Sequence, residues 1–226
     1  MEALRPFELD RQRMVQVQIR RRGVRDERVL EALRRVPRHE FVPAKFLEFA
    51  YEDRPLPIGE TETISQPYMV AAMSEAAAVQ PGDKVLEVGC GSGYQAAILA
   101  FLGAQVFSME RNPALADSAR ARLARLGYGD VIVICGDGSE GYAPAAPYGA
   151  IVVAAGSPQT PPALLDQLAE GGRMVIPVGG LTGQQLQLLH KSASGISVRD
   201  LDLCQFVPLV GKYGWTEESA AHRTRG

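Results

Sequence analysis

The chain has 226 residues, a length that corresponds to one or two domains. Hydrophobic residues make up 46% of it and charged residues 22%, a balance that excludes an intrinsically disordered or collagen-like chain. The net charge of −2 does not favour a nucleic-acid-binding protein, which usually carries a strong basic excess.

Three cysteines, Cys90, Cys135 and Cys204, lie far apart and show no CxxC spacing. They predict neither a disulfide framework nor a zinc site, and they suit a reducing compartment. The N-terminus carries no secretory signal. Residues 88–109 form an uncharged run long enough to span a bilayer, but its glycines and glutamines favour a strand, a loop and a helix. We therefore expect a soluble, cytoplasmic protein without a metal site.

The N-terminal part of the chain is predicted to be helical. Residues 9–36 indicate two short helices that are interrupted at Gly23, and Asp26 can cap the second one. Several prolines between residues 37 and 57 indicate an irregular connector. A further helix is predicted over residues 67–79, because Pro67 suits a first helical turn.

From residue 84 onward, short apolar strands alternate with helices. This alternation predicts right-handed crossovers and a largely parallel sheet that helices cover on both faces. The predicted strands are residues 84–88, 105–109, 131–135, 150–153 and 173–177, and the predicted helices are residues 94–102, 113–126 and 162–168. Two later segments, residues 185–189 and 203–207, are predicted to add an antiparallel edge.

The predicted fold is therefore α/β, with a Rossmann-like, doubly wound, mostly parallel sheet, an antiparallel edge and a helical N-terminal extension. We expect the extension to cover residues 1–80 and the α/β core residues 81–215, followed by a polar, disordered tail over residues 216–226. Ligands of such sheets bind outside the carboxyl ends of the strands, so a site is expected in the strand-end loops.

The first strand-end loop is rich in glycine. Strand 84–88 is followed by Gly89, Cys90, Gly91, Ser92 and Gly93, and then by a predicted helix. Glycines at this position allow a tight turn and a close approach of the backbone to a ligand, and the helix start offers unpaired N–H groups. A turn that is merely tight, without a ligand, is the alternative interpretation.

Two further features indicate the kind of ligand. Glu110 stands at the end of the next strand, where a carboxylate can accept hydrogen bonds from both ribose hydroxyls, although a surface charge is the alternative. The dinucleotide fingerprint needs a third glycine where the chain has Tyr94, and the phosphate-binding motif GxxxxGK[ST] does not occur. A ribose site without a phosphate site indicates an adenosine ligand that lacks phosphates, such as S-adenosylmethionine.

At this point the sequence resembles a known family over residues 10–215. VLEVGCGSGY resembles motif I of the class I methyltransferases, which many enzymes share. ISQPYM, together with VPRHEFVP, YEDRPLPIG and FVPLVGKYGW, is similar to the protein-L-isoaspartate O-methyltransferases and is specific to that family. The resemblance implies methyl transfer from S-adenosylmethionine to the free α-carboxylate of L-isoaspartyl residues in damaged proteins and peptides. A monomeric enzyme of protein repair is expected.

The resemblance also implies roles for residues of the cofactor site. Gly89, Gly91 and Gly93, with Cys90 and Ser92 between them, would frame the cofactor. Glu87 would lie near its methionine part, Glu110 at the ribose, and Asp137 with Gly138 near the adenine.

On the substrate side, Ser65 matches the active-site serine of the family, and Thr63 and Ile64 would line the same pocket. The substrate carboxylate is already ionised at neutral pH, so the reaction needs no strong base, and Ser65 would orient the carboxylate by a hydrogen bond. The alternative role of Ser65 is to cap the helix that begins at Pro67.

Three segments of the sequence depart from the family pattern. The family usually has Gly-Gln where this chain has Thr61 and Glu62, it has a threonine in the segment 153–156, and it has an aromatic residue in place of Ser139. A carboxylate at Glu62 would repel an anionic substrate, so an enzyme that methylates a different peptide carboxylate is an alternative. A non-catalytic module that binds the cofactor or a partner, and a dehydrogenase, are further alternatives, and Tyr94 disfavours the dehydrogenase.

Overall fold

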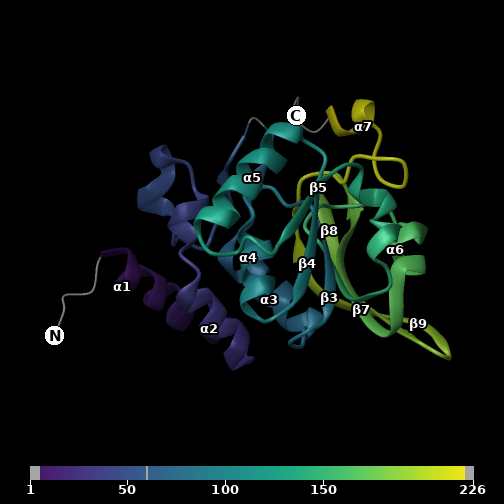
Figure 1. Cartoon of the computed structure of the whole chain (residues 1–226), viewed down its shortest axis with the longest axis horizontal. Coiled ribbons are helices and arrows are strands. Elements are labelled where there is room, and N and C mark those ends of the chain that lie inside the picture. The colour runs from purple at the N-terminus through teal and green to yellow at the C-terminus, as the bar shows by residue number, and fades with distance from the viewer. Residues whose placement is uncertain (1–5, 60, 222–226) are drawn as a thin grey trace.

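A computed structural model of the chain describes residues 6–59 and 61–221, and its central element is a mixed β-sheet (Figure 1). The strands of this sheet are β3 (Lys84–Val88), β4 (Gln105–Glu110), β5 (Ile132–Cys135), β6 (Tyr148–Val153), β7 (Leu168–Gly180), β8 (Gly183–Ser192) and β9 (Gly195–Cys204). In the described part of the chain they follow the order β5-β4-β3-β6-β7-β8-β9. Pairs from β5 to β7 are parallel, whereas β8 and β9 pair antiparallel. The predicted α/β fold with an antiparallel edge is confirmed.

The helices predicted from residue 67 onward agree with the observed ones to within a few residues, whereas the first predicted helix is divided into an α-helix, a π-helix (Met14–Ile19) and a 3-10 helix (Arg20–Arg22). The α-helices of the described residues are α1 (Pro6–Arg13), α2 (Glu27–Arg35), α3 (Pro67–Ala77), α4 (Tyr94–Phe101), α5 (Pro113–Arg125), α6 (Pro162–Gln167) and α7 (Glu217–Ala221). Gly23 ends the first helical segment in a left-handed conformation with φ of 109°, which glycine adopts without strain. Asp26 caps α2 by accepting a hydrogen bond from the backbone N–H of Arg28 at 2.8 Å.

The N-terminal extension packs into the same core as the sheet. Met14, Leu30 and Leu33 of the extension are fully buried, and they belong to one hydrophobic cluster with Val85 of β3 and Ile98 of α4. Since the apolar surface of the extension is removed from water only against the α/β core, the two parts are expected to unfold together.

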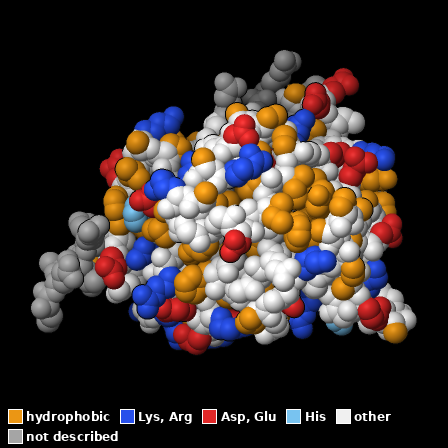
Figure 2. Space-filling model, in the orientation of Figure 1, with side chains coloured by type: hydrophobic (Ala, Val, Ile, Leu, Met, Phe, Trp, Pro, Cys, Tyr) orange, Lys and Arg blue, Asp and Glu red, His pale blue; other side chains and the backbone are white. Residues whose placement is uncertain are grey.

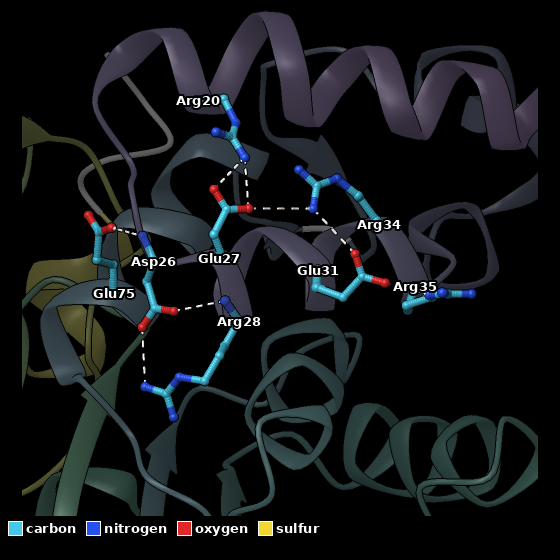
Figure 3. Close-up of polar contacts among 8 residues, drawn as sticks. All are labelled: Arg20, Asp26, Glu27, Arg28, Glu31, Arg34, Arg35 and Glu75. Atoms are coloured by element: carbon cyan, nitrogen blue, oxygen red, sulfur yellow. Dashed lines mark hydrogen bonds and ion pairs between the residues drawn. The ribbon is translucent and has the colours of Figure 1, made fainter.

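Ion pairs join the polar side of α2 to its neighbours (Figure 3). Arg20 contacts Glu27 at 2.7 Å, and Arg34 reaches both Glu27 and Glu31. The glutamates of these pairs are exposed and the arginines are partly exposed, so water screens each pair and its contribution to stability is small. Glu75 of α3 accepts a hydrogen bond from the backbone N–H of Asp26 at 2.7 Å, which fixes the start of α2 against α3.

The two faces of the sheet are covered unequally. Helices α3, α4 and α5 pack on the face that carries the larger hydrophobic cluster, whereas the smaller cluster on the other face is covered by α6 and short turns. Near β4 and β5 on this second face, Phe107 and Ile134 are only partly buried and Ile132 is 49% exposed. Figure 2 shows the resulting gathering of hydrophobic side chains in this region of the surface.

The antiparallel edge differs from the predicted one. Strand β9 covers residues 195–204, so the strand predicted over residues 203–207 is wrong beyond Cys204. After β9 the chain no longer pairs with β8 as a strand. Phe206 N–H donates to the side-chain Oε1 of Gln184 at 2.8 Å, and the Val207 carbonyl accepts from Gly156 N–H at 2.8 Å. Most side chains of β9 are exposed, and an exposed edge strand lacks the apolar pattern that makes strands recognisable in a sequence.

The prediction of a disordered tail is wrong for residues 217–221, which form α7. Thr216 precedes this helix, and its hydroxyl oxygen accepts a hydrogen bond from the backbone N–H of Ser219 at 3.2 Å. The rest of the predicted tail, residues 222–226, lies outside the described residues. No helix among the described residues is long and apolar enough to cross a membrane.

Candidate functional site

A cavity of about 560 Å³ lies at the carboxyl edge of the parallel strands, and its volume suits a small-molecule ligand. Its lining from the ends of β3, β4 and β6 consists of Val88, Gly89, Gly91, Met109, Glu110, Arg111, Ala154 and Ala155. The remaining wall comes from segments 61–63 and 207–210, from Gly138, and from α7. Three lining residues are acidic (Glu62, Glu110 and Glu217) and one is basic (Arg111), so the cavity favours a cationic ligand over a phosphate.

The glycine loop after β3 forms one side of this cavity. Gly91 has φ of 52°, and a Cβ there would lie 3.2 Å from Ile58 Cδ1. Gly93, with φ of 89°, begins α4 and allows it to approach Leu123 of α5. Gly89 and Gly91 line the cavity as predicted. Gly93 does not line it and serves the packing of two helices instead.

Two other residues of the loop lie behind it. The Cys90 side chain is 4% exposed, and burial raises the pKa of its thiol well above the ordinary value. Ser92 is 5% exposed, and its carbonyl accepts a hydrogen bond from Arg122 Nη1 at 2.9 Å. Neither residue is among those that line the cavity, and their part in binding the cofactor stays a prediction.

Glu110 lies at the end of β4 beside the loop, as predicted. Its Oε2 accepts a hydrogen bond from Gly91 N–H at 2.8 Å, and its Oε1 accepts one from Asn112 N–H at 2.9 Å. These two bonds fix the carboxylate in the cavity wall. Each carboxylate oxygen can accept a further hydrogen bond, so Glu110 remains able to receive two hydroxyl groups of a ribose.

Glu87 is fully buried and is not among the residues that line the cavity, so its place near the methionine part of the ligand stays a prediction. The alternation along β3 turns Val88 toward the cavity and Glu87 to the opposite face. There Ser108 Oγ donates a hydrogen bond to Glu87 Oε2, and Oε1 has no partner among the described residues. Burial raises the pKa of Glu87 to about 8, and the nearby charge of Glu110 acts in the same direction.

This raised pKa predicts how Glu87→Gln changes stability with pH. Between the model-peptide pKa of 4.5 and about 8, the unfolded chain loses the Glu87 proton while the folded chain keeps it. Stability of the wild type therefore falls across this window, and the glutamine variant lacks that loss. We expect the melting temperature of the variant to rise relative to wild type by several degrees from pH 5 to pH 8, since each kcal/mol corresponds to about 2–4 °C at this size.

Thermal melts of both proteins at the two pH values measure this difference. Glu48→Gln, at an exposed position, is the control for removal of a carboxylate. A constant gap between wild type and Glu87→Gln would show that Glu87 does not titrate in this range.

Asp137 and Gly138 are neighbours in the sequence, but only Gly138 lines the cavity. Gly138 lines the cavity, and a Cβ there would lie 2.5 Å from Val88 Cγ1, so the close approach requires glycine. The Asp137 carboxylate accepts hydrogen bonds from Ser139 N–H at 2.9 Å and from Lys212 N–H at 2.7 Å. It borders a second hollow of about 380 Å³ rather than the main cavity. The Asp137 carboxylate thus holds the loop around residue 212, and its position near an adenine stays a prediction.

The segment before α3 forms another part of the wall. Strand β2 (Thr63–Ile64) pairs with β1 (Leu56–Pro57), and Thr63 lines the cavity together with Thr61 and Glu62. Ile64 is 3% exposed and belongs to the core, so it does not line the pocket. The two positions that depart from the family pattern, Thr61 and Glu62, are thus in the site itself.

Ser65 lies next to this wall and is half-buried. It is not the N-cap of α3, since Gln66 occupies that position and its side chain is bound to Asp53 at 2.8 Å. The alternative capping role of Ser65 is therefore wrong. Among the described residues the Ser65 hydroxyl makes no hydrogen bond, which leaves it available to a ligand.

A residue that the sequence reasoning missed, Arg38, holds Ser65 in place. This fully buried arginine donates from Nη2 to the Ser65 carbonyl at 2.8 Å and from Nε to the Ala50 carbonyl at 2.9 Å. Burial lowers the pKa of Arg38 to about 10, so the guanidinium stays charged at neutral pH. A buried arginine cannot be recognised from its own sequence position, although it stands within the quoted VPRHEFVP.

Other missed residues reach the cavity from distant parts of the chain. Arg111 follows Glu110, segment 207–210 lies within the quoted FVPLVGKYGW, and Glu217, Ala220 and Ala221 belong to the predicted tail. The sequence did carry a signal for α7, because a threonine followed by two glutamates is a helix start. Across residues 6–59 and 61–221, no three His, Cys, Asp or Glu side chains gather as ligands for a metal ion.

Fold and site together define a class of protein. The glycine loop after the first strand of the parallel sheet and the carboxylate at the end of the next strand are joined by a hydrogen bond and border one cavity. A solved structure titled protein-L-isoaspartate O-methyltransferase shares this fold with a TM-score of 0.81 and 31% identity, covering 90% of this chain and 67% of that chain. The chain is therefore a methyltransferase with a Rossmann-like fold.

More specific comparisons identify the family. The model of the protein-L-isoaspartate(D-aspartate) O-methyltransferase family matches residues 9–214. A protein-L-isoaspartate O-methyltransferase of Koribacter versatilis is 56% identical over 210 residues, which are 93% of this chain and 95% of that protein. A protein-L-isoaspartate O-methyltransferase of Methanoculleus marisnigri is 54% identical over 213 residues, which are 94% of this chain and 97% of that protein. The chain belongs to the protein-L-isoaspartate O-methyltransferase family.

A further solved structure of this kind contains a ligand. It is a putative protein-L-isoaspartate O-methyltransferase from Plasmodium falciparum in complex with S-adenosyl-L-homocysteine. Its TM-score is 0.75 at 25% identity, and the match covers 87% of this chain and 96% of that chain.

Proposed function

We propose that the cavity at the carboxyl edge of the sheet binds S-adenosylmethionine beside an L-isoaspartyl residue, and that the chain methylates the free α-carboxylate of this residue. The observation that carries the proposal is that one cavity contains both the glycine loop with Glu110 and the segment 61–63 next to Ser65. A cofactor and an acceptor bound at these two places would be neighbours. The product is a methyl ester on a damaged protein or peptide.

The residues of the cavity fit S-adenosylmethionine, which supplies a sulfonium methyl group when it is bound. Glu110 would accept hydrogen bonds from the ribose, and Gly91 and Gly138, which line the cavity, allow close packing against Ile58 and Val88. The excess of carboxylates over Arg111 in the lining suits a ligand with a positive charge.

The protein's main contribution to the reaction is positioning. A carboxylate with an ordinary pKa is ionised at neutral pH, so the site has no proton to remove. Ser65 would donate a hydrogen bond to one oxygen of the substrate carboxylate and leave the other directed at the cofactor. Arg38, which holds the Ser65 backbone from inside the core, limits the movement of this serine. Holding the reacting groups in line contributes on the order of 7–11 kcal/mol in favourable cases.

The direct test is transfer of labelled methyl groups from S-adenosylmethionine to a short L-isoaspartyl peptide, with the L-aspartyl peptide of the same sequence as control. Methylation of both peptides at similar rates would favour the alternative enzyme that acts on other carboxylates. No methylation of any peptide, despite cofactor binding, would favour the non-catalytic module.

Ser65→Ala is expected to lower the turnover number for methyl transfer roughly tenfold, as for loss of a hydrogen bond to a charged group. The affinity for S-adenosylhomocysteine should change much less, because Ser65 does not line the cavity next to Glu110. Peptide kinetics and calorimetry separate the two quantities, and Ser65→Thr keeps the hydroxyl as a control. Full turnover in Ser65→Ala would remove this residue from the reaction.

The oligomeric state and the cellular location are proposed on independent grounds. The cavity is lined from several elements of this chain, and a monomeric enzyme is proposed. Cys90, Cys135 and Cys204 are all free thiols, which supports a reducing, cytoplasmic location. Sedimentation of the purified chain tests the first proposal.

A further inference from the structure

The last described helix, α7, closes part of the cavity although it lies outside the family match. That match ends at residue 214, and α7 covers Glu217–Ala221 (Figure 1). Glu217, Ala220 and Ala221 line the cavity, and Glu217 contacts Arg111. The helix has only five residues and is too short to be stable by itself, so other groups must hold it there.

The first of these groups is Trp215, directly before the helix. Its indole Nε1 donates to the Gly156 carbonyl at 3.1 Å, in the loop that follows β6. Its backbone N–H donates to the Leu209 carbonyl at 2.7 Å, and its carbonyl accepts from Gly211 N–H at 3.1 Å. The turn over residues 209–215 is therefore closed on itself and fixed to the strand ends, which sets the starting point of α7.

The second anchor is an ion pair at the edge of the cavity. Arg111 Nη2 contacts Glu217 Oε1 at 2.8 Å, and Arg111 directly follows Glu110. Both side chains are exposed, at 50% and 82%, so the pair contributes orientation more than stability. It brings α7 to the part of the cavity where Glu110 would receive the ribose.

We infer that Glu217, Ala220 and Ala221 are part of the cofactor site and that α7 slows release of the bound nucleoside. The inference rests on the proposed function, because the ligand it concerns is S-adenosylmethionine or its product S-adenosylhomocysteine. Ala220 and Ala221 line the cavity, and their small side chains would cover a bound nucleoside without filling the space that it needs. Glu217 is held by Arg111 and keeps α7 over the ribose.

The experiment measures S-adenosylhomocysteine binding by calorimetry and its dissociation rate constant by stopped flow, in four proteins. They are the full chain, a chain that ends at Trp215, Glu217→Arg and Glu218→Arg. The last two variants carry the same charge change at adjacent positions of α7, but only Glu217 lines the cavity and pairs with Arg111. Thermal melts show whether each variant is folded.

The chain that ends at Trp215 should release the ligand on the order of tenfold faster, comparable to the loss of two buried methyl groups. Glu217→Arg should release it about two- to fivefold faster, as for the loss of an exposed ion pair, and Glu218→Arg should match the full chain. If the shortened chain does not fold, the comparison of Glu217→Arg with Glu218→Arg decides. If Glu217→Arg and a folded shortened chain both release the ligand at the rate of the full chain, this inference is overturned and the proposed function is unaffected. Absence of any binding to the full chain would overturn both.

Discussion

An L-isoaspartyl peptide is expected to be methylated about a hundredfold faster than the L-aspartyl peptide of the same sequence. In the isoaspartyl residue the backbone runs through the side-chain carbonyl, and the α-carboxylate is free one methylene closer to the chain than an aspartyl carboxylate. A site that holds this oxygen in line with the methyl donor would misplace the aspartyl oxygen by about 1 Å, and such a displacement can cost about a hundredfold in rate. The measurement is the ratio of kcat/KM for the two peptides.

The site offers a physical reason for this discrimination. Ser65 is held through its backbone by the buried Arg38, at 2.8 Å, and the segment before it is paired in a small hairpin. Neither element can follow a displaced carboxylate without breaking buried contacts. Equal kcat/KM values for both peptides would contradict the isoaspartyl assignment, whereas the family membership of the chain would be unaffected.

Glu110→Ala is expected to weaken binding of S-adenosylhomocysteine about ten- to a hundredfold. Losing hydrogen bonds from both ribose hydroxyls to a charged acceptor should cost roughly 1.5–3 kcal/mol. The same change also leaves Gly91 N–H and Asn112 N–H without their acceptor, which loosens the glycine loop that borders the cavity. Calorimetric titration with S-adenosylhomocysteine measures the affinity directly.

Two variants serve as controls for Glu110→Ala. Glu110→Asp keeps the charge on a shorter side chain and should weaken binding less. Asp117→Ala removes an exposed carboxylate on α5 and should bind as the wild type does, since Asp117 contacts Arg120 on the same helix. Wild-type affinity in Glu110→Ala would exclude this residue from the cofactor site.

Much of the fold was predictable because its determinants are local in the sequence. The alternation of apolar strands and helices from residue 84 predicts the parallel sheet, and every strand of that sheet from β3 to β7 was found. Glycine conformations and helix caps depend only on neighbouring residues, so the loop at Gly91 and the cap at Asp26 were also predictable. Together these features place Glu110 beside the glycine loop.

The tertiary structure alone decided which side chains face the cavity. Glu87 lies within the glycine-loop motif, yet the alternation of strand β3 turns it into the core. Asp137 bonds to the backbone of Lys212, 75 positions away, and Ser65 is held by Arg38, 27 positions away. Partners so far apart are brought together only when the sheet and the extension pack around a common core, because burial and long-range hydrogen bonds depend on packing and not on local sequence. The same holds for α7. Its short polar sequence indicates a helix, but the contacts of Trp215 and Arg111 set its position over the cavity.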